Sequence, residues 1–150
     1  MYTRALQGKE EALGPKHTST LDTVNNLSSL YADQGKLAEA EAIYIRALQG
    51  YEEALGPDHT STLLTVNNLG SLYKNQGKLA EAEAMYTRAL QGYKDALGPE
   101  ILRSYLPALN TMIAFGDLFS WTGRKDMAKD IYSQALSGYT NCPRTFLEMV

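Results

Sequence analysis

The side chains best suited to chemistry are two adjacent pairs of asparagine, Asn25 with Asn26 and Asn67 with Asn68. Asparagine is a poor helix former, yet both pairs lie in segments whose apolar residues recur at helical spacing. Each side-chain amide has donors and an acceptor, so it can bind the backbone of an extended peptide whatever its sequence. Alternatively, the amides bond to a neighbouring part of the same chain. The pattern indicates either peptide binding or an internal polar contact.

The other polar residues give little support for catalysis. His17 and His59 are equivalent loop residues without a Cys or second His at metal-ligand spacing, which favours a turn role. Gly70 to Lys78 superficially suggests a phosphate loop, but six residues rather than four separate its glycines, and Leu79 replaces the hydroxyl residue that would hold magnesium. No nucleophile, base and orienting group can be assembled. We predict a non-enzyme without cofactor or metal site.

Composition excludes further classes of function. The 14 Lys and Arg residues are scattered among 17 Asp and Glu, with a net charge of −3, so no basic stripe is available for nucleic acid. No apolar run approaches the roughly 20 residues needed to cross a bilayer, and a signal peptide is missing. The expected location is cytoplasmic, with no membrane partner. The single cysteine, Cys142, cannot form an intrachain disulfide.

The elements that position these side chains are sequence repeats. A seven-residue segment beginning at Tyr2 returns almost unchanged at Tyr44 and Tyr86, a period of 42 residues. Such a period is typical of stacked arrays, in which each unit buries its apolar face against its neighbours. Within a repeat, two stretches of helical periodicity are separated by Gly77, and the second ends at Gly98 before a proline. The repeating unit is predicted to be a helical hairpin.

We predict an all-α chain of about seven helices, stacked as antiparallel hairpins. A half repeat covers 1–15, repeats cover 16–57 and 58–99, a divergent repeat covers 100–141, and a tail covers 142–150. The divergent repeat has four additional residues between 101 and 107, where Pro107 either kinks a longer helix or begins its main part. The chain begins in mid-hairpin, which indicates a fragment of a longer array or self-association through the uncapped half repeat.

Two further features concern the second helix of each repeat. Gly50 and Gly92 lie inside these helices, and close backbone contact with the next hairpin is the expected reason. The acidic residues of these helices are interpreted as a solvated face rather than as a catalytic carboxylate pair. These acidic residues are Glu39, Glu41, Glu52 and Glu53.

A family resemblance follows from small and aromatic residues at fixed positions. The pattern of Leu69 with Gly70, Tyr73, Gly77, Ala82, Tyr86 and Ala89 with Leu90 resembles the tetratricopeptide repeat. The longer period and the phrase from Ala54 to His59 resemble the kinesin-light-chain subclass, also found in fungal and bacterial NLR-type proteins. The resemblance implies a right-handed α-solenoid whose first helices line a concave groove for peptides or partner helices. It also supports peptide contacts at Asn26 and Asn68.

The predicted groove consists of the positions that the apolar stripe leaves free on the first helices. Ile113 and Trp121 replace amides at the far end, where either they form an apolar anchor pocket or the tail buries Trp121. The groove residues are Asp22, Asn25, Asn26, Ser29, Asp33, Leu64, Asn67, Asn68, Ser71, Lys74, Asn75, Asn110, Ile113, Asp117 and Trp121.

The first two full repeats differ mainly on this predicted groove. When the two copies are aligned, Asp22 corresponds to Leu64, Ala32 to Lys74, and Asp33 to Asn75. The differences reflect either ligand specificity or drift at solvent-facing sites. The predicted function is a scaffold that binds a protein or peptide in the groove. The alternative is a self-associating array or spacer within a larger multidomain protein.

Overall fold

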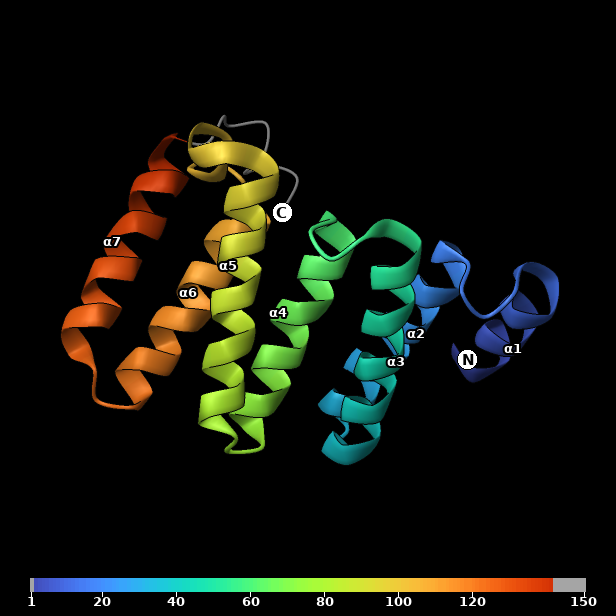
Figure 1. The fold of residues 1–150 in the computed structure, drawn as a ribbon. Coiled ribbons are helices and arrows are strands. Elements are labelled where there is room, and N and C mark those ends of the chain that lie inside the picture. Colours follow the sequence, from blue (N-terminus) through green and yellow to red (C-terminus); the bar gives the residue numbers. More distant parts are fainter. Residues whose placement is uncertain (1, 142–150) are drawn as a thin grey trace.

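The computed structural model describes residues 2–141 and consists of antiparallel helical hairpins stacked in a row (Figure 1). Met1 and residues 142–150, which include Cys142 and the predicted tail, lie outside the described residues. Helix α1 precedes the hairpins α2–α3, α4–α5 and α6–α7. The helices are α1 (Tyr2–Leu13), α2 (Thr18–Asp33), α3 (Leu37–Leu55), α4 (Thr60–Asn75), α5 (Leu79–Leu102), α6 (Leu106–Trp121) and α7 (Lys125–Asn141).

Each hairpin forms because two amphipathic helices bury their apolar stripes against each other. In α4, Leu63 and Val66 are fully buried and Leu69 is 3% exposed, which confirms the stripe predicted from their spacing. In α5, Ala82 and Ala89 are fully buried, and their small side chains allow the two helices to approach closely. All-helical hairpins are therefore the repeating unit.

The helix ends follow the predicted turn residues. Gly77 ends α4 with φ of 77°, a conformation that strains any residue with a Cβ atom. Gly98 has φ of 76° and ψ of 165°, so α5 is broken at Gly98 and a short helical segment continues to Leu102. Pro107 lies in the first turn of α6, so it begins this helix and does not kink it.

The hydrophobic core is shared between neighbouring hairpins. One cluster joins α3, α4, α5 and α6 through residues such as Tyr44, Leu69 and Tyr93. A second cluster joins α5, α6 and α7, and a third joins α1, α2 and α3. No hairpin buries its apolar surface by itself, as expected of a repeat array.

The hairpins form a layer of first helices (α2, α4 and α6) and a layer of second helices (α1, α3, α5 and α7). Helix α2 contacts α4, and α4 contacts α6, so the first helices lie close to one another. In the described residues, the second helices of successive hairpins have no such close backbone approach. The first helices therefore lie closer to one another than the second helices do.

Gly50 and Gly92 have a different role from the one predicted. A Cβ atom on Gly50 would lie 2.4 Å from Leu21 Cδ2, and one on Gly92 would lie 2.4 Å from Leu63 Cδ2. Both leucines belong to the first helix of the same hairpin. The glycines therefore make room for a buried leucine side chain, whereas we expected the backbone of the next hairpin.

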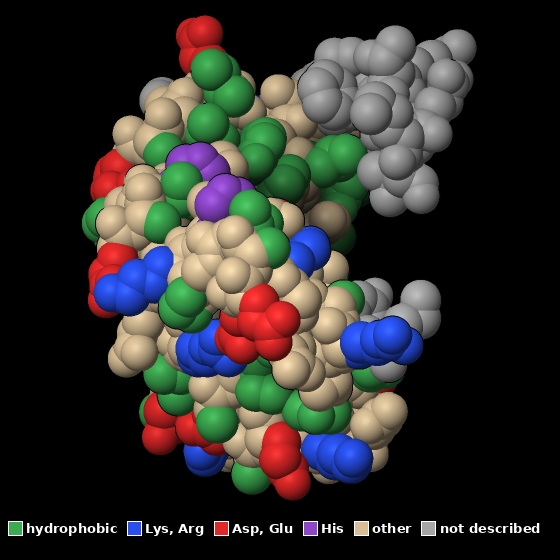
Figure 2. All heavy atoms as spheres, turned by 90° about the vertical axis from the view of Figure 1, so that its right-hand side faces the viewer, with side chains coloured by type: hydrophobic (Ala, Val, Ile, Leu, Met, Phe, Trp, Pro, Cys, Tyr) green, Lys and Arg blue, Asp and Glu red, His purple; other side chains and the backbone are tan. Residues whose placement is uncertain are grey.

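Ion pairs connect the second helices across the hairpins. Glu41 and Glu52 are half-buried and bind Lys78 and Arg88 of the following repeat, so these two residues of the predicted solvated face also form ion pairs between repeats. Charged side chains of both signs are interspersed in the view from the α1 end of the array (Figure 2). None of the described helices has both the length and the apolar character needed to cross a membrane.

Candidate functional site

The predicted groove residues all lie on the layer of first helices, and none of them is buried. We call their exposed surface the first-helix face. Nine side chains are exposed, and the other six are half-buried. The half-buried residues are Asn25, Ser29, Asn67, Asn68, Ser71 and Lys74. The helical periodicity therefore places the predicted residues on one accessible surface.

A hollow on this face lies between α2 and α4. Its lining brings together five predicted residues: Ser29, Asp33, Asn68, Ser71 and Asn75. Its other lining side chains are Ala32, Tyr44 and Leu72. The hollow therefore offers a carboxylate, amides and hydroxyls beside apolar side chains.

The two asparagines of each pair have different environments. Thr65 Oγ1 donates to Asn25 Oδ1 across 3.3 Å, so the alternative of a contact with the neighbouring hairpin applies to Asn25. Asn67 is half-buried, and its buried Oδ1 has no hydrogen-bond partner among residues 2–141. The amides of Asn26 and Asn68 make no side-chain hydrogen bond within the described part of the chain. These two amides are available to a ligand.

Three predicted groove residues also anchor the second helices. Ser29 Oγ lies 2.7 Å from Tyr44 Oη, and Ser71 Oγ lies 2.9 Å from Tyr86 Oη. In the third hairpin, Tyr132 donates to a carboxylate oxygen of Asp117, and this bond raises the pKa of Tyr132 to about 12. A signal for these contacts was present in the sequence, because each pair is separated by 15 residues.

A second tyrosine contact is present in two hairpins and missing in the middle one. Tyr51 donates to Asp22, and Tyr139 donates to Asn110. In α4 the position equivalent to these two acceptors is occupied by Leu64, whose side chain cannot accept a hydrogen bond. The buried hydroxyl of Tyr93 accordingly has no partner among the described residues. The difference between Asp22 and Leu64 therefore changes an internal contact as well as the surface.

The far end of the first-helix face is apolar and accessible. Trp121 is 64% exposed. The alternative in which the tail buries this indole depends on residues 142–150, which lie outside the described residues. Leu64 and Ile113 are also exposed, and Lys74 Nζ lies 5.5 Å from the centre of the Trp121 ring. A cation held above an indole at this distance is attracted by the ring electrons. Lys74, where the previous repeat has Ala32, thus extends the surface toward Trp121.

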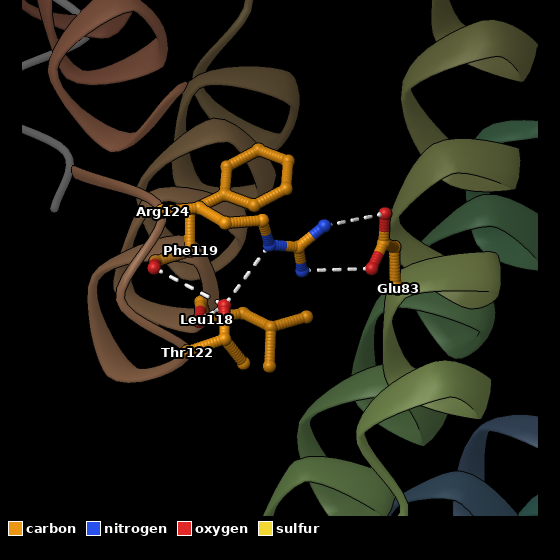
Figure 3. A network of polar contacts seen from close by, with 5 residues as sticks. All are labelled: Glu83, Leu118, Phe119, Thr122 and Arg124. Atoms are coloured by element: carbon orange, nitrogen blue, oxygen red, sulfur yellow. Dashed lines mark hydrogen bonds and ion pairs between the residues drawn. The ribbon is translucent and has the colours of Figure 1, made fainter. Parts of the chain in front are cut away.

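The contacts between α5 and the turn before α7 show how neighbouring hairpins are fixed. Both terminal nitrogens of Arg124 donate to the carboxylate of Glu83, at 3.0 and 2.8 Å, and Arg124 Nε donates to Thr122 (Figure 3). The guanidinium also lies 4.6 Å from the centre of the Phe119 ring. The bonds from Arg124 hold the pKa of Glu83 below its usual value. This contact stabilises the stack and lies outside the first-helix face.

The two histidines cap helices. His17 Nδ1 accepts from the backbone N–H of Ser19 at 3.2 Å, and His59 Nδ1 accepts from Ser61 at 3.1 Å. The predicted turn role is therefore confirmed, because each imidazole satisfies a free donor at a helix start. Within the described residues, no group of three or more His, Cys, Asp or Glu side chains is arranged to hold a metal ion.

The model of the tetratricopeptide repeat matches residues 19–95, just over half of the sequence. The chain belongs to the tetratricopeptide repeat family. Members of this family are generally non-catalytic scaffolds for protein interactions. The repeat signature predicted from the small and aromatic residues is thereby confirmed. A search of curated protein sequences finds no match.

Solved structures of kinesin-light-chain-like proteins have the same fold. BtubC (BKLC) from P. vanneervenii superposes with a TM-score of 0.81 and 22% identity, covering 93% of this tetratricopeptide repeat chain and 54% of that one. A putative kinesin light chain from P. anserina, with nearly identical repeats, gives 0.75 and 17% identity, covering 91% and 62%. This chain thus spans somewhat over half the length of these neighbours. Identities this low show the shared fold alone.

Proposed function

We propose that this tetratricopeptide repeat chain is a non-catalytic module that binds an extended peptide or a helical segment of a partner protein on its first-helix face. The observation that carries the proposal is the hollow between α2 and α4, which Asn68 and Asn75 line together with Asp33. Asn26 and Asn68 add amides that have no partner in the described residues. A cytoplasmic location and a protein partner are part of this proposal.

The chemistry of the face suits a peptide backbone. Peptide N–H and C=O groups lose water when they enter a hollow, so they need donors and acceptors there. The free amides of Asn26 and Asn68 supply both kinds of group in successive repeats. Trp121, at the other end of the face, offers a large rigid surface for one apolar side chain of the ligand.

The test is a double substitution, Asn26→Ala with Asn68→Ala, probed with an array of extended peptides. We expect binding to weaken by about tenfold or more, since two hydrogen bonds to the backbone are lost. Peptides that bind are followed in solution through the fluorescence of Trp121, the single tryptophan of the chain. Unchanged affinity in the double variant would refute a groove that works through these amides.

A matched control uses two amides on the opposite layer. Gln7 and Gln49 are equivalent residues of α1 and α3, and both are exposed. Replacing both with alanine removes the same number of amides and leaves the first-helix face intact. We expect this control to bind peptides like the unchanged protein.

A structural role as a self-associating array or spacer is the second candidate. Lys36 Nζ lies 5.4 Å from the centre of the Tyr31 ring, and Lys78 Nζ lies at the same distance from the Tyr73 ring. Lys78 also pairs with Glu41, whereas Lys36 has no carboxylate partner among the described residues. The α1 end thus presents a cation in a position that binds a carboxylate elsewhere in the array. Light scattering at high concentration tests this candidate, and a strictly monomeric mass would count against self-association.

A further inference from the structure

The layer of second helices is held together by an ion pair that repeats along the array. Arg46 of α3 pairs with Glu10 of α1, and Arg88 of α5 pairs with Glu52 of α3. Each arginine lies 36 residues after its glutamate, so the two pairs are equivalent contacts of successive repeats. They connect second helices whose backbones do not approach closely.

The same contact is lost between α5 and α7. The residues that correspond to Glu52 and Arg88 are Lys94 and Gln134, a cation facing a neutral amide. Lys94 has no ion-pair partner within the described part of the chain. A hollow lined by both residues lies at this place, above buried Met112, Phe115 and Ile131.

A second departure from the repeat, an insertion of four residues, lies beside the missing ion pair. The four additional residues fall between 101 and 107, around the turn from α5 to α6, and a second hollow there is lined by Arg103, Leu109 and Ser137. Both hollows are also lined by Leu102, Met112 and Gln134, so they adjoin each other. We call the two hollows together the α5–α7 cleft. Arg103 is exposed and has no side-chain partner in the described residues.

The cleft thus combines an apolar floor with two unpaired cations. Its apolar side chains are Leu90, Leu102, Leu109, Met112, Phe115 and Ile131. Lys94 and Arg103 stand on its lining, while Gln134 and Ser137 supply neutral polar groups. No carboxylate is found among the described residues that line it. An occupant with large apolar side chains gains by their burial, and carboxylates on it gain ion pairs that the protein leaves unmade.

We propose that the α5–α7 cleft is a second binding site, separate from the first-helix face, for a partner-protein segment that carries large apolar and acidic side chains. Charge complementarity selects the acidic segment, because both free charges of the cleft are positive. The site lies on the layer opposite the first-helix face, so both surfaces can be occupied at once. The chain then joins two partner segments.

The test restores the missing ion pair. Lys94→Glu with Gln134→Arg recreates the pair of Glu52 with Arg88, which spans the corresponding gap one repeat earlier. We expect this double variant to close the cleft while keeping the fold, since its contact already exists twice in the array. The control is Asn26→Ala with Asn68→Ala, which changes only the first-helix face.

The probes are two fluorescein-labelled peptides with the same leucine and phenylalanine residues and either glutamate or lysine between them. We expect the glutamate peptide to bind the unchanged protein at least about tenfold more tightly than the lysine peptide by fluorescence polarisation. It should lose that affinity in the closed variant and keep it in the control. Trp121 fluorescence should stay constant, because the indole lies on the other face.

Several results would overturn the proposal. Equal binding of both peptides, or unchanged affinity in the closed variant, would show that the cleft does not select an acidic segment. Binding of decanoate but of neither peptide would assign the cleft to small amphiphiles. If the glutamate peptide binds only after residues 142–150 are removed, the occupant is the chain's own tail. If the asparagine variant still binds the peptides of the first-helix face, the proposed function fails but the proposal for the α5–α7 cleft does not. The two tests can therefore fail independently.

Discussion

The hairpins α2–α3 and α4–α5 have nearly the same sequence, yet they differ in how they satisfy one buried tyrosine. Tyr51 of the first hairpin donates to Asp22, whereas the hydroxyl of Tyr93 in the second finds no partner among the described residues. The cause is Leu64, which replaces the acceptor. An unsatisfied buried hydroxyl normally costs about 1–3 kcal/mol. The second hairpin therefore tolerates a cost that the first avoids.

The apolar packing of the two hairpins explains this tolerance. Leu21 faces Gly50 in the first hairpin as Leu63 faces Gly92 in the second, with the same 2.4 Å separation from the position of an added Cβ. Both leucines are essentially fully buried. The two hairpins thus share the close leucine–glycine contact, whereas of these two hairpins only the first has the tyrosine hydrogen bond.

The largest expected effect tests the shared packing. Leu21→Ala and Leu63→Ala should each lower the free energy of unfolding by about 3 kcal/mol, since both remove a buried side chain and leave a cavity. Denaturant unfolding with matched m-values measures both. Costs that differ by more than about 1 kcal/mol would show that the two hairpins do not share this contact.

The glycine facing each leucine provides a control for that prediction. Gly92→Ala alone should destabilise by about 1 kcal/mol, because its Cβ meets a buried leucine and overpacking outweighs the gain in helix propensity. In the Leu63→Ala background the same change should stabilise, since the space is then free. The pair Gly50→Ala and Leu21→Ala should behave alike.

An effect of intermediate size distinguishes the two tyrosines. Tyr51→Phe should cost about 1 kcal/mol, because it removes the bond to Asp22. Tyr93→Phe should leave stability unchanged or raise it by up to about 1 kcal/mol, since it removes an unsatisfied hydroxyl. Thermal unfolding of both variants gives the comparison. Equal losses would mean that Tyr93 has a polar partner after all.

Leu64→Asn is the reverse experiment. It places at α4 the residue type that accepts from Tyr139 in the third hairpin. We expect a gain of about 0.5–1 kcal/mol that disappears when Tyr93→Phe is added. A gain that persists in the double variant would point to a cause other than the tyrosine bond.

The smallest effect concerns acid stability. Hydrogen bonds from Lys78 and Gln76 lower the pKa of Glu41, and those from Arg124 lower the pKa of Glu83. A carboxyl group whose pKa is lowered in the folded state stabilises the protein at pH values above its usual pKa of 4.5. This contribution is lost as the pH falls through the lowered pKa. We expect the melting temperature to drop modestly below about pH 5, with a shallower drop in Glu83→Gln. An unchanged profile in that variant would contradict the role of the pair.

Much of the scaffold followed from local sequence. The stripe of Leu63, Val66 and Leu69 was predictable because burial on one helix face requires that spacing. The turn at Gly77 was predictable because a left-handed conformation excludes nearly every other residue, and the break at Gly98 was predictable because the proline after it cannot continue a helix. Pro107 left two alternatives open, and its place in the first turn of α6 decided that it begins this helix.

The candidate site was less accessible to such reasoning. Spacing placed Asn25 and Asn26 on one face, but it did not show that Thr65 engages only the first of them. The α5–α7 cleft was missed entirely, although Lys94 and Gln134 differ in charge from Glu52 and Arg88. That signal becomes visible only when the ion pairs of the earlier repeats are known.

The sequence alone determined that this chain is a stack of helical hairpins of the tetratricopeptide type, because a 42-residue period and a helical stripe dictate local structure. The tertiary structure decided which polar groups are engaged and which stay free. Those outcomes depend on contacts between residues some 36 to 41 positions apart, such as Glu52 with Arg88 and Glu83 with Arg124. A repeat period fixes how each hairpin folds, whereas residues distant in the sequence, in the same hairpin or in its neighbour, supply or withhold the partner.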